Sequence, residues 1–331
     1  MSNDEIFRGK TVLITGGTGT FGHAFAGTLL EKDLIQKVII FSRDEWKQWE
    51  MREANPLFKS QKARFFLGDV RDEERLKRAF NEVNFVVHAA ALKQVPAAEY
   101  NPSEFVKTNI NGAMHVINAA IEAGVEKVVA LSSDKAVNPI NLYGATKLCS
   151  DKLFLAAKSY VGKKGSPRFS IVRYGNVLGS RGSLLPFWKK LIADGAKSLP
   201  VTDIEMTRFW ITIPQAVNFV MKALERMHGS EIFVPKSPSV KITDLAKALA
   251  PALSHQLIGV RPGEKIHEVL ISPDDAYSTY ELNDCYLLTP TSEAVKKEAK
   301  KVEAHFCLQS NINPLFMSDV AAISQLLKEY K

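Results

Sequence analysis

The stretch TGGTGTFG, Thr15–Gly22, is the first indication of the fold of this chain. It follows the apolar run TVLI and precedes apolar residues at the 3.6-residue spacing of a helix. Gly16, Gly19 and Gly22 let the backbone turn sharply and approach a diphosphate, and the helix that starts here offers free N–H groups to an anion. A bare tight turn is the alternative. The strand before it and the helix after it favour a phosphate-binding loop.

Apolar strands alternate with helical segments over the first 175 or so residues. The runs KVIIFSR, ARFFLGDV, NFVVHAAA, KVVALSSD and RFSIVRYGNV indicate strands, and helices are expected at about 109–123 and 142–159. This alternation predicts an α/β fold, a Rossmann-type doubly wound parallel sheet with helices on both faces.

After Asn176 the rhythm breaks into loops and short elements around one further helix, for which Thr212 and Gln215 form a capping box. We expect residues 1–175, with a returning segment at about 207–229, to form a nucleotide-binding domain. Residues 176–206 and 230–331 are expected to form a smaller, interleaved α/β substrate-binding lobe. The last fifty or so residues, from about Glu281, carry no motif that indicates a role.

Composition narrows the classes of partner. The chain has 43 basic and 36 acidic side chains, a formal net charge of +7, which would favour nucleic acid or a membrane surface if the charges were clustered. The densest basic run, Lys296–Lys301, is interleaved with glutamates at helical spacing and predicts a solvated helix face. We therefore expect no nucleic acid and no membrane partner.

The cysteines and the N-terminal residues indicate a cytoplasmic protein. Cys149, Cys285 and Cys307 form no CxxC pair and are odd in number, which is typical of reduced thiols. Cys149 has no histidine nearby in sequence, so we expect a small packed side chain rather than a nucleophile. MSNDEIFRGK lacks a signal-peptide pattern, and no run of 18 apolar residues occurs. His88 and His267 lack metal-ligand spacing, so no metal site is expected.

The end of the second strand bears on the choice of dinucleotide. An acidic side chain here binds the ribose 2′-hydroxyl of NAD, whereas a guanidinium matches a 2′-phosphate. Arg43, with Lys47 one turn on, favours NADP, while Asp44 keeps NAD open and a plain surface charge is the alternative for Arg43. Asp69 ends the third strand, where a carboxylate can hold the adenine edge.

Tyr143 and Lys147 are one helical turn apart and share a face. An ammonium close to a phenol lowers the phenol pKa from about 10, so that the tyrosine can take a hydroxyl proton. Upstream, Asp134 closes a predicted strand, at the end that faces the ligand crevice in such sheets, and Lys135 follows it. Asp134 and Lys135 offer an acid and a base, and a surface salt bridge is the alternative.

Together, TGGTGTFG, HAAALK, SSDK and YGATK resemble the extended short-chain dehydrogenase/reductase family over nearly the whole chain. The segments AALKQVPAAEYNP, SSDKAVNPINLYGATK, RYGNVLGSRGS, PVTDIEMTRFWIT and RPGEKIHE further resemble the inverting UDP-N-acetylglucosamine 4,6-dehydratases that open pseudaminic acid synthesis. The resemblance implies an NADP-dependent lyase that acts on UDP-N-acetylglucosamine and forms homo-oligomers.

The resemblance also implies the chemistry. Tyr143, assisted by Lys147 and Ser133, would take the O4 proton as the C4 hydride leaves for the nicotinamide. Lys135 would then remove the C5 proton and Asp134 would protonate O6 as water departs, before hydride returns to C6. These roles require the pKa of Lys135 to fall and that of Asp134 to rise. Retaining relatives have a glutamate in place of Lys135, which is consistent with inversion at C5 here.

The remaining positions carry over as binding residues. The implied cofactor set is Gly16, Thr18, Gly19, Thr20, Phe21, Gly22, Ser42, Arg43, Lys47, Asp69, Val70, Ala89, Ala90, Asn109, Tyr143, Lys147 and Val177. The implied substrate set is Lys93, Asn176, Thr202, Met206, Arg261 and Glu264, each of which has a local loop contact as its alternative. A 4-epimerase, a retaining dehydratase and a non-catalytic NADP-binding protein stay open as other functions.

Overall fold

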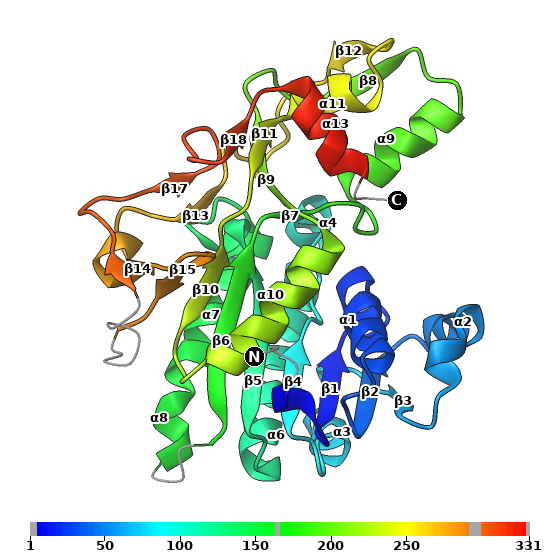
Figure 1. Ribbon diagram of the computed structural model, residues 1–331, viewed down its shortest axis with the longest axis vertical. Coiled ribbons are helices and arrows are strands. Elements are labelled where there is room, and N and C mark those ends of the chain that lie inside the picture. The colour runs from blue at the N-terminus through cyan, green and yellow to red at the C-terminus, as the bar shows by residue number, and fades with distance from the viewer. Residues whose placement is uncertain (1–4, 163–165, 291–298, 329–331) are drawn as a thin grey trace. The chain divides into compact units, whose positions relative to one another are not determined.

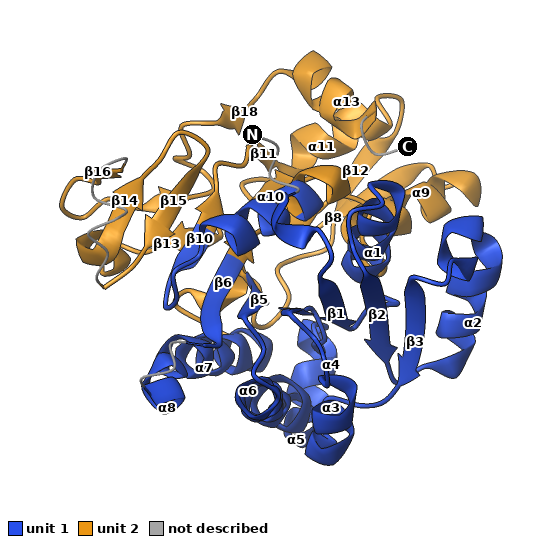
Figure 2. Ribbon diagram, turned by 60° about the horizontal axis from the view of Figure 1, so that its bottom comes forward, with its two compact units in different colours: residues 1–132, 142–172, 217–233 blue, residues 133–141, 173–216, 234–331 orange. Residues whose placement is uncertain are grey.

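The computed structural model describes residues 5–162, 166–290 and 299–328, and the chain divides into two compact units (Figure 2). Unit 1 comprises residues 1–132, 142–172 and 217–233, and unit 2 comprises residues 133–141, 173–216 and 234–331. These units differ from the predicted bounds, since residues 133–141 and 173–175 group with unit 2 and the returning segment runs from 217 to 233 rather than from about 207 to 229. Residues 133–141 group with unit 2 because Lys135, Val137 and Asn141 are bonded to residues 263–268 of that unit.

Unit 1 contains a sheet with the strand order β3-β2-β1-β4-β5-β6-β10 (Figure 1). The strands are β1 (Thr11–Thr15), β2 (Lys37–Ser42), β3 (Ala63–Leu67), β4 (Phe85–His88), β5 (Lys127–Ser133), β6 (Arg168–Tyr174) and β10 (Ile232–Pro235). The pairs β1–β2, β1–β4, β2–β3, β4–β5 and β6–β10 are parallel. Every residue of β1 is buried, as expected for a strand covered on both faces. The predicted doubly wound fold is confirmed.

Helices cover both faces of this sheet, with α3, α6 and α7 in one layer and α1 on the opposite face (Figure 2). The helical elements are η1 (Glu5–Phe7), α1 (Thr20–Glu31), α2 (Glu45–Ala54), η2 (Pro56–Lys59), α3 (Glu73–Ala79), α4 (Val95–Tyr100), α5 (Pro102–Phe105), a π-helical segment (Val106–Asn111), α6 (Gly112–Ala123), α7 (Leu142–Ala156), α8 (Lys158–Val161) and α10 (Ile213–Arg226). The predicted capping box begins α10, because Gln215 N donates to Thr212 Oγ1 at 3.3 Å and Thr212 N donates to Gln215 Oε1 at 3.0 Å.

In its described residues, unit 2 is built from short strands and three longer helices. One sheet has the order β18-β11-β9-β7, formed by β18 (Phe316–Met317), β11 (Ser239–Lys241), β9 (Thr207–Ile211) and β7 (Asn176–Val177). The other elements are η4 (Asp134–Ala136), α9 (Leu184–Ala193), β8 (Ser198–Val201), α11 (Ile242–Leu249), β12 (Ser254–Leu257), β13 (Val269–Ile271), η6 (Asp275–Ser278), β14 (Thr279–Glu281), β15 (Cys285–Leu288), β16 (Lys300–Lys301), β17 (Leu308–Gln309) and α13 (Val320–Lys328). Trp188, Trp210 and Leu245 are fully buried at the centre of a core that includes α9, α11 and α13.

The C-terminal fifty residues, to which the sequence assigned no role, complete unit 2. Strand β17 pairs with β13, and β18 pairs with β11. Asn313 donates to Ser237 O at 2.9 Å and to Ser239 Oγ at 3.0 Å. Lys300 and Lys301 are exposed, but they pair with β14 as an extended strand, so the predicted helix is wrong at these two residues. Residues 296–298 of that predicted helix lie outside the described residues.

The cysteines form no disulfide, as predicted, but Cys149 is exposed and the expectation of a packed side chain is wrong. The buried face of α7 carries Tyr143, Lys147 and Asp151 at four-residue spacing, and Cys149 points away from it. None of the helices in the described ranges is both long and apolar enough to cross a membrane.

Candidate active site

Two glycines of the loop after β1, Gly16 and Gly22, lie too close to neighbouring backbone to be replaced by a larger residue. Gly16 has a φ of +66°, and a Cβ there would lie 2.9 Å from the Ala90 backbone. A Cβ on Gly22 would lie 2.6 Å from Gly17 Cα. Gly19 is the N-cap of α1 and makes no side-chain cap hydrogen bond to the helix. The loop therefore has the shape and the donors that fit a diphosphate.

Several predicted cofactor residues line or support this loop in unit 1. Thr18 is buried, while Thr20 and Phe21 are half-buried in the first turn of α1. Ala89 and Ala90 follow β4, and Ala90 N donates to Thr15 Oγ1 at 3.3 Å. The end of β4 thus stands against the end of β1, as the parallel register requires.

At the end of β2, the acidic side chain of Asp44 makes its bonds inside the protein. Asp44 caps α2 by accepting from Lys47 N at 3.0 Å, and it pairs with Lys47 Nζ at 2.7 Å. Arg43 is exposed, and its guanidinium lies 3.8 Å from Asp69. Ser42 is buried and accepts from Gln48. At this strand end the Arg43 guanidinium is exposed, whereas the Asp44 carboxylate is bonded to Lys47.

At the end of β3, Asp69 stands beside buried Val70. Burial raises the pKa of the Asp69 carboxyl, but hydrogen bonds from Arg71 and the charge of Arg43 lower it more, so the group is an anion at neutral pH.

Helix α7 buries both members of the predicted Tyr–Lys pair. Tyr143 is 9% exposed and packs with Ala98 and Phe105, and Lys147 is 4% exposed. Nζ of Lys147 donates to Leu131 O at 2.7 Å. Burial lowers the pKa of Lys147, and Asp151 partly opposes this.

Asn109 of the π-helical segment is 2% exposed and uses its whole amide inside unit 1. It bonds the backbone N–H and carbonyl of Leu92, each at 2.9 Å, and Thr146 at 3.0 Å. It therefore fixes the loop that carries exposed Lys93.

Unit 2 contains a buried cluster of charges immediately after β5. Asp134 is 1% exposed, and its Oδ1 accepts from Ser133 Oγ at 2.8 Å and from Lys135 Nζ at 3.1 Å. Lys135 Nζ also lies 3.1 Å from Oε1 of Glu268, which is 2% exposed. Arg208 Nε is 3.8 Å from the same Glu268 oxygen. A surface salt bridge is excluded as an account of Asp134 and Lys135.

The cluster raises the pKa of both predicted acid–base groups, Asp134 and Lys135. Burial raises the pKa of Asp134, the charge of Lys135 lowers it and the charge of Glu268 raises it again, with a net increase. Burial lowers the pKa of Lys135, but the two carboxylates outweigh burial and raise it above its usual range. The expected rise for Asp134 is present. The predicted fall in the pKa of Lys135 is wrong, because the carboxylate of Glu268 was not predicted to lie beside this lysine.

The residues missed from sequence are Arg208, Lys265 and Glu268. Arg208 donates to the carbonyls of Thr207, Ile266 and Lys265 at 2.7–3.0 Å, which holds the segment before Glu268 in place. Lys265 Nζ donates to Val137 O at 2.6 Å. The signal for Lys265 and Glu268 was the charge density of RPGEKIHE, where Arg261 and Glu264 were chosen instead, and Arg208 stands in the quoted segment PVTDIEMTRFWIT.

The predicted substrate residues of unit 2 differ in how exposed they are and in what they contact. Asn176 and Val177 form β7 beside β9. Thr202 is half-buried after β8, whereas Met206 is 3% exposed and belongs to the hydrophobic core. Arg261 is exposed, 3.8 Å from Glu264. Glu264 Oε2 is buried without a hydrogen-bond partner in the described part of the chain.

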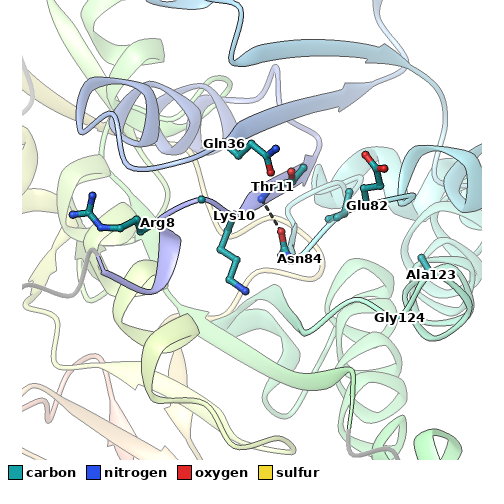
Figure 3. Close-up of a pocket in the computed structure, with 10 residues that line it drawn as sticks. Arg8, Lys10, Thr11, Gln36, Glu82, Asn84, Ala123 and Gly124 are labelled. Atoms are coloured by element: carbon teal, nitrogen blue, oxygen red, sulfur yellow. Dashed lines mark hydrogen bonds between the residues drawn. The ribbon is translucent and has the colours of Figure 1, made fainter.

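A polar hollow of about 620 Å³ lies elsewhere in unit 1 (Figure 3). Arg8, Lys10, Gln36 and Asn84 line it, and Thr11 N donates to Asn84 Oδ1 at 2.8 Å. These residues precede β1, β2 and β4, so the hollow is at the amino ends of the strands, away from the glycine-rich loop at the other end of β1. None of the predicted site residues lines it.

His88 and His267 each make a hydrogen bond to a threonine side chain of the protein. His88 is buried and shares a 2.8 Å hydrogen bond with Thr15 Oγ1, and His267 Nδ1 lies 2.9 Å from Thr207 Oγ1. Across the ranges that the structure describes, no group of three acidic, histidine or cysteine side chains could hold a metal ion.

The strand order, the glycine-rich loop and the buried Tyr143–Lys147 pair define an extended short-chain dehydrogenase/reductase. The chain belongs to the polysaccharide biosynthesis protein family, whose model matches residues 12–290. The resemblance predicted from sequence is confirmed.

Two curated relatives and one solved structure illustrate the similarity. The chain is 55% identical to a UDP-N-acetylglucosamine 4,6-dehydratase (inverting) of Campylobacter jejuni strain 81-176, over 95% of this chain and 96% of that protein. It is 43% identical to a UDP-glucose 4-epimerase of Rickettsia canadensis, over 85% of this chain and 83% of that protein. The X-ray structure of Pen from Bacillus thuringiensis superposes with a TM-score of 0.89 at 35% identity, covering 98% of each chain.

Proposed function

We propose that this protein is an NADP-dependent UDP-N-acetylglucosamine 4,6-dehydratase that inverts C5, a lyase. The observation that carries the proposal is the pair of buried Asp134 and half-buried Lys135, 3.1 Å apart, at the end of β5. Elimination of water needs one group that accepts the C5 proton and another that protonates O6. The similarity to the Campylobacter jejuni dehydratase supports the same reading.

NADP is the proposed cofactor, and it supplies the chemistry of accepting a hydride and returning it. The glycine-rich loop would hold its diphosphate, since that loop has no room for a Cβ at Gly16 or Gly22. Arg43 and Lys47 would hold a 2′-phosphate. The use of Asp44 as a helix cap supports NADP over NAD, because that carboxylate already accepts two hydrogen bonds.

Tyr143 is proposed to take the O4 proton of the hexose. Lys147 keeps its ammonium on the Leu131 carbonyl, where its positive charge favours the phenolate, and Ser133 would orient O4. The resulting 4-ketone makes the C5 hydrogen acidic.

Asp134 is proposed to donate its proton to O6 while Lys135 takes the proton from C5. The raised pKa of Asp134 suits the acid. The raised pKa of Lys135 means that the lysine must lose a proton before it can accept one. Only the fraction of enzyme with Asp134 protonated and Lys135 neutral would eliminate water, so the pH profile of kcat would be bell-shaped.

The diphosphate and uridine of the substrate are assigned to residues outside the acid–base pair. Arg261 would pair with phosphate and Glu264 with the ribose, while Lys93, Asn176 and Thr202 would contribute polar contacts. Met206 would act through the core that shapes its loop, since its side chain is buried.

A 4-epimerase is the second candidate, favoured by the similarity to the Rickettsia canadensis protein. An epimerase needs Tyr143 and Lys147 but no acid at O6 and no base at C5. A retaining dehydratase and a non-catalytic NADP-binding protein are further alternatives, and the first would leave the C5 configuration unchanged.

The deciding experiment is proton NMR of the purified protein with UDP-N-acetylglucosamine in D₂O. A C6 methyl signal with the couplings of an L-arabino product supports the proposal, and a D-xylo product supports the retaining dehydratase. A UDP-N-acetylgalactosamine product would support the epimerase, as would a Lys135→Ala variant with full turnover beside an inactive Tyr143→Phe variant. Bound NADP with an unchanged sugar would leave the non-catalytic function.

We further propose that the protein is a cytoplasmic homo-oligomer whose product enters pseudaminic acid synthesis. Light scattering tests the assembly, and a single monomer mass would contradict it. Fractionation of cells tests the location.

A further inference from the structure

The buried cluster of unit 2 contains one carboxylate, that of Glu268, to which the proposed reaction assigns no role. Lys135 Nζ lies 3.1 Å from Asp134 Oδ1 and 3.1 Å from Glu268 Oε1. Asp134 and Glu268 are 1% and 2% exposed, so two buried carboxylates compete for the ammonium of Lys135, whose side chain is 24% exposed. Two buried carboxylates that share one cation do not both ionise readily, so one of them keeps a proton more easily than the other.

The surroundings decide which carboxylate is the anion. Arg208 adds a second positive charge 3.8 Å from Glu268, and that guanidinium is itself fixed by three main-chain carbonyls. Ser310 Oγ accepts from Glu268 N at 3.0 Å and anchors the backbone at that position. In the described part of the chain, the cation that pairs directly with Asp134 is Lys135, and Ser133 is a neutral donor to it. Glu268 is therefore the permanent anion of the cluster.

The second oxygen of Asp134 is placed to carry a proton. Among the described residues, Asp134 Oδ2 and Glu268 Oε2 are both buried without a hydrogen-bond partner, but Glu268 lies beside two cations that favour its ionised form. A Cβ at position 175 would lie 3.3 Å from this oxygen, and glycine occupies that position. Oδ1 already accepts two hydrogen bonds, so Oδ2 is the atom that can hold and give up a proton.

We propose that Glu268 is a positioning residue for the proposed dehydration: its buried carboxylate fixes the Lys135 ammonium beside Asp134 and leaves the transferable protons to Asp134 and Lys135. This inference rests on the proposed function. Before the step, the Lys135 ammonium gives up one proton to solvent; in the step itself, the C5 proton moves to the neutral Nζ of Lys135 and the electron pair of the C5–H bond forms the C5–C6 double bond. The C6–O6 bond breaks, O6 receives the Asp134 proton, and water leaves. Glu268 neither gains nor loses a proton.

The charged groups that face Glu268 within unit 2 are Lys135, Arg208 and Lys265, and Asp134 shares Lys135 with it. Removing the charge of Glu268 takes a negative charge away from both Asp134 and Lys135, so the pKa of each falls. Both limbs of the bell-shaped profile then move to lower pH. A change that merely loosened the fold would reduce the rate without moving the profile.

The test uses Glu268→Gln, Glu268→Asp and, as matched control, Glu281→Gln, which removes a carboxylate from an ion pair with Lys236 elsewhere in unit 2. Carboxyl-carbon NMR of Asp134 and Nζ nitrogen NMR of Lys135 are followed against pH in the substrate-free protein. We expect both pKa values to fall by about one unit or more in Glu268→Gln, by less in Glu268→Asp, and not at all in Glu281→Gln. Unchanged pKa values in a folded Glu268→Gln protein would overturn the inference.

Turnover supplies the second measurement. We expect kcat of Glu268→Gln to fall by about a hundredfold, with the whole pH profile displaced to lower pH, and Glu268→Asp to restore part of the rate at the original optimum. A lower rate with an unmoved profile in Glu268→Gln would also overturn the inference. If the wild-type protein makes no methyl sugar, the proposed function fails, and the NMR titration still decides whether Glu268 sets the protonation of the pair.

Discussion

Nζ of Lys147 donates a 2.7 Å hydrogen bond to the carbonyl oxygen of Leu131, two residues before the end of β5. The bond ties α7 to the strand and holds a cation that is only 4% exposed. The position of the Lys147 side chain is thus fixed by this contact.

We expect Lys147→Met to lower kcat by about a hundredfold or more, because Tyr143 would lose the charge that favours its phenolate. Steady-state kinetics with UDP-N-acetylglucosamine measures this. The control is Lys152→Met, an exposed lysine on the same helix, which should keep its rate. Equal rates in the two variants would remove Lys147 from the mechanism.

Two glycines of α1 should respond in opposite ways to alanine. A Cβ on Gly22 would lie 2.6 Å from Gly17 Cα, so Gly22→Ala should displace the glycine-rich loop and abolish detectable NADPH binding. A Cβ on Gly27 would meet only Phe58, at 3.8 Å, so Gly27→Ala should bind normally and gain up to about 1 kcal/mol in free energy of unfolding from helix propensity. Fluorescence titration and urea unfolding provide the two measurements. Normal NADPH binding by Gly22→Ala would show that the cofactor lies elsewhere.

Arg43→Ala should weaken NADPH binding about tenfold to a hundredfold and leave NADH binding nearly unchanged, because a charge-assisted bond to the 2′-phosphate would be lost. Calorimetric titration of both dinucleotides measures the ratio. Arg64→Ala, at an exposed position on the neighbouring strand β3, is the control. An equal loss for both dinucleotides would argue against recognition of the 2′-phosphate by Arg43.

Stability should fall in mild acid because of His88. Burial, reinforced by the charge of Lys147, lowers the pKa of His88 to about 3 in the folded protein, against about 6.5 when unfolded. Below pH 6.5 the unfolded chain binds a proton that the folded chain excludes, so the free energy of unfolding falls as the pH drops toward 3, by about 5 kcal/mol at most.

Urea unfolding of the wild-type protein and of His88→Gln between pH 7.5 and 5 measures this contribution. The decline should be shallower in His88→Gln, whereas His255→Gln, a half-exposed histidine, should behave like the wild type. The same slope in His88→Gln and the wild type would show that other groups cause the loss.

Local sequence was sufficient for the sheet and for the residues at the ends of its strands. The spacing of Gly16, Gly19 and Gly22, the alternation of apolar strands with helices, and the four-residue step from Tyr143 to Lys147 are short-range patterns. Each is set by backbone geometry over a few residues, so each is visible without knowledge of the rest of the chain. The capping box at Thr212 was visible for the same reason.

Cys149 and the run at Lys300 show where such patterns fail. The first was expected to pack, but the stripe formed by Tyr143, Lys147 and Asp151 took the buried face of α7. The second has helical charge spacing, but main-chain pairing with β14 required an extended backbone. In both, a contact outside the local window outweighed local preference.

The sequence by itself determined that this chain forms a nucleotide-binding α/β sheet and that an acid and a base follow its fifth strand, because both features are local. The rise in the pKa of both groups, by contrast, depends on contacts that only the tertiary structure makes. Glu268 and Arg208 come from distant parts of the chain, and they meet Lys135 where burial removes water and makes their charges act strongly on one another. No pattern of spacing encodes that meeting, since it depends on how segments 133–141, 207–211 and 261–268 fold together within unit 2.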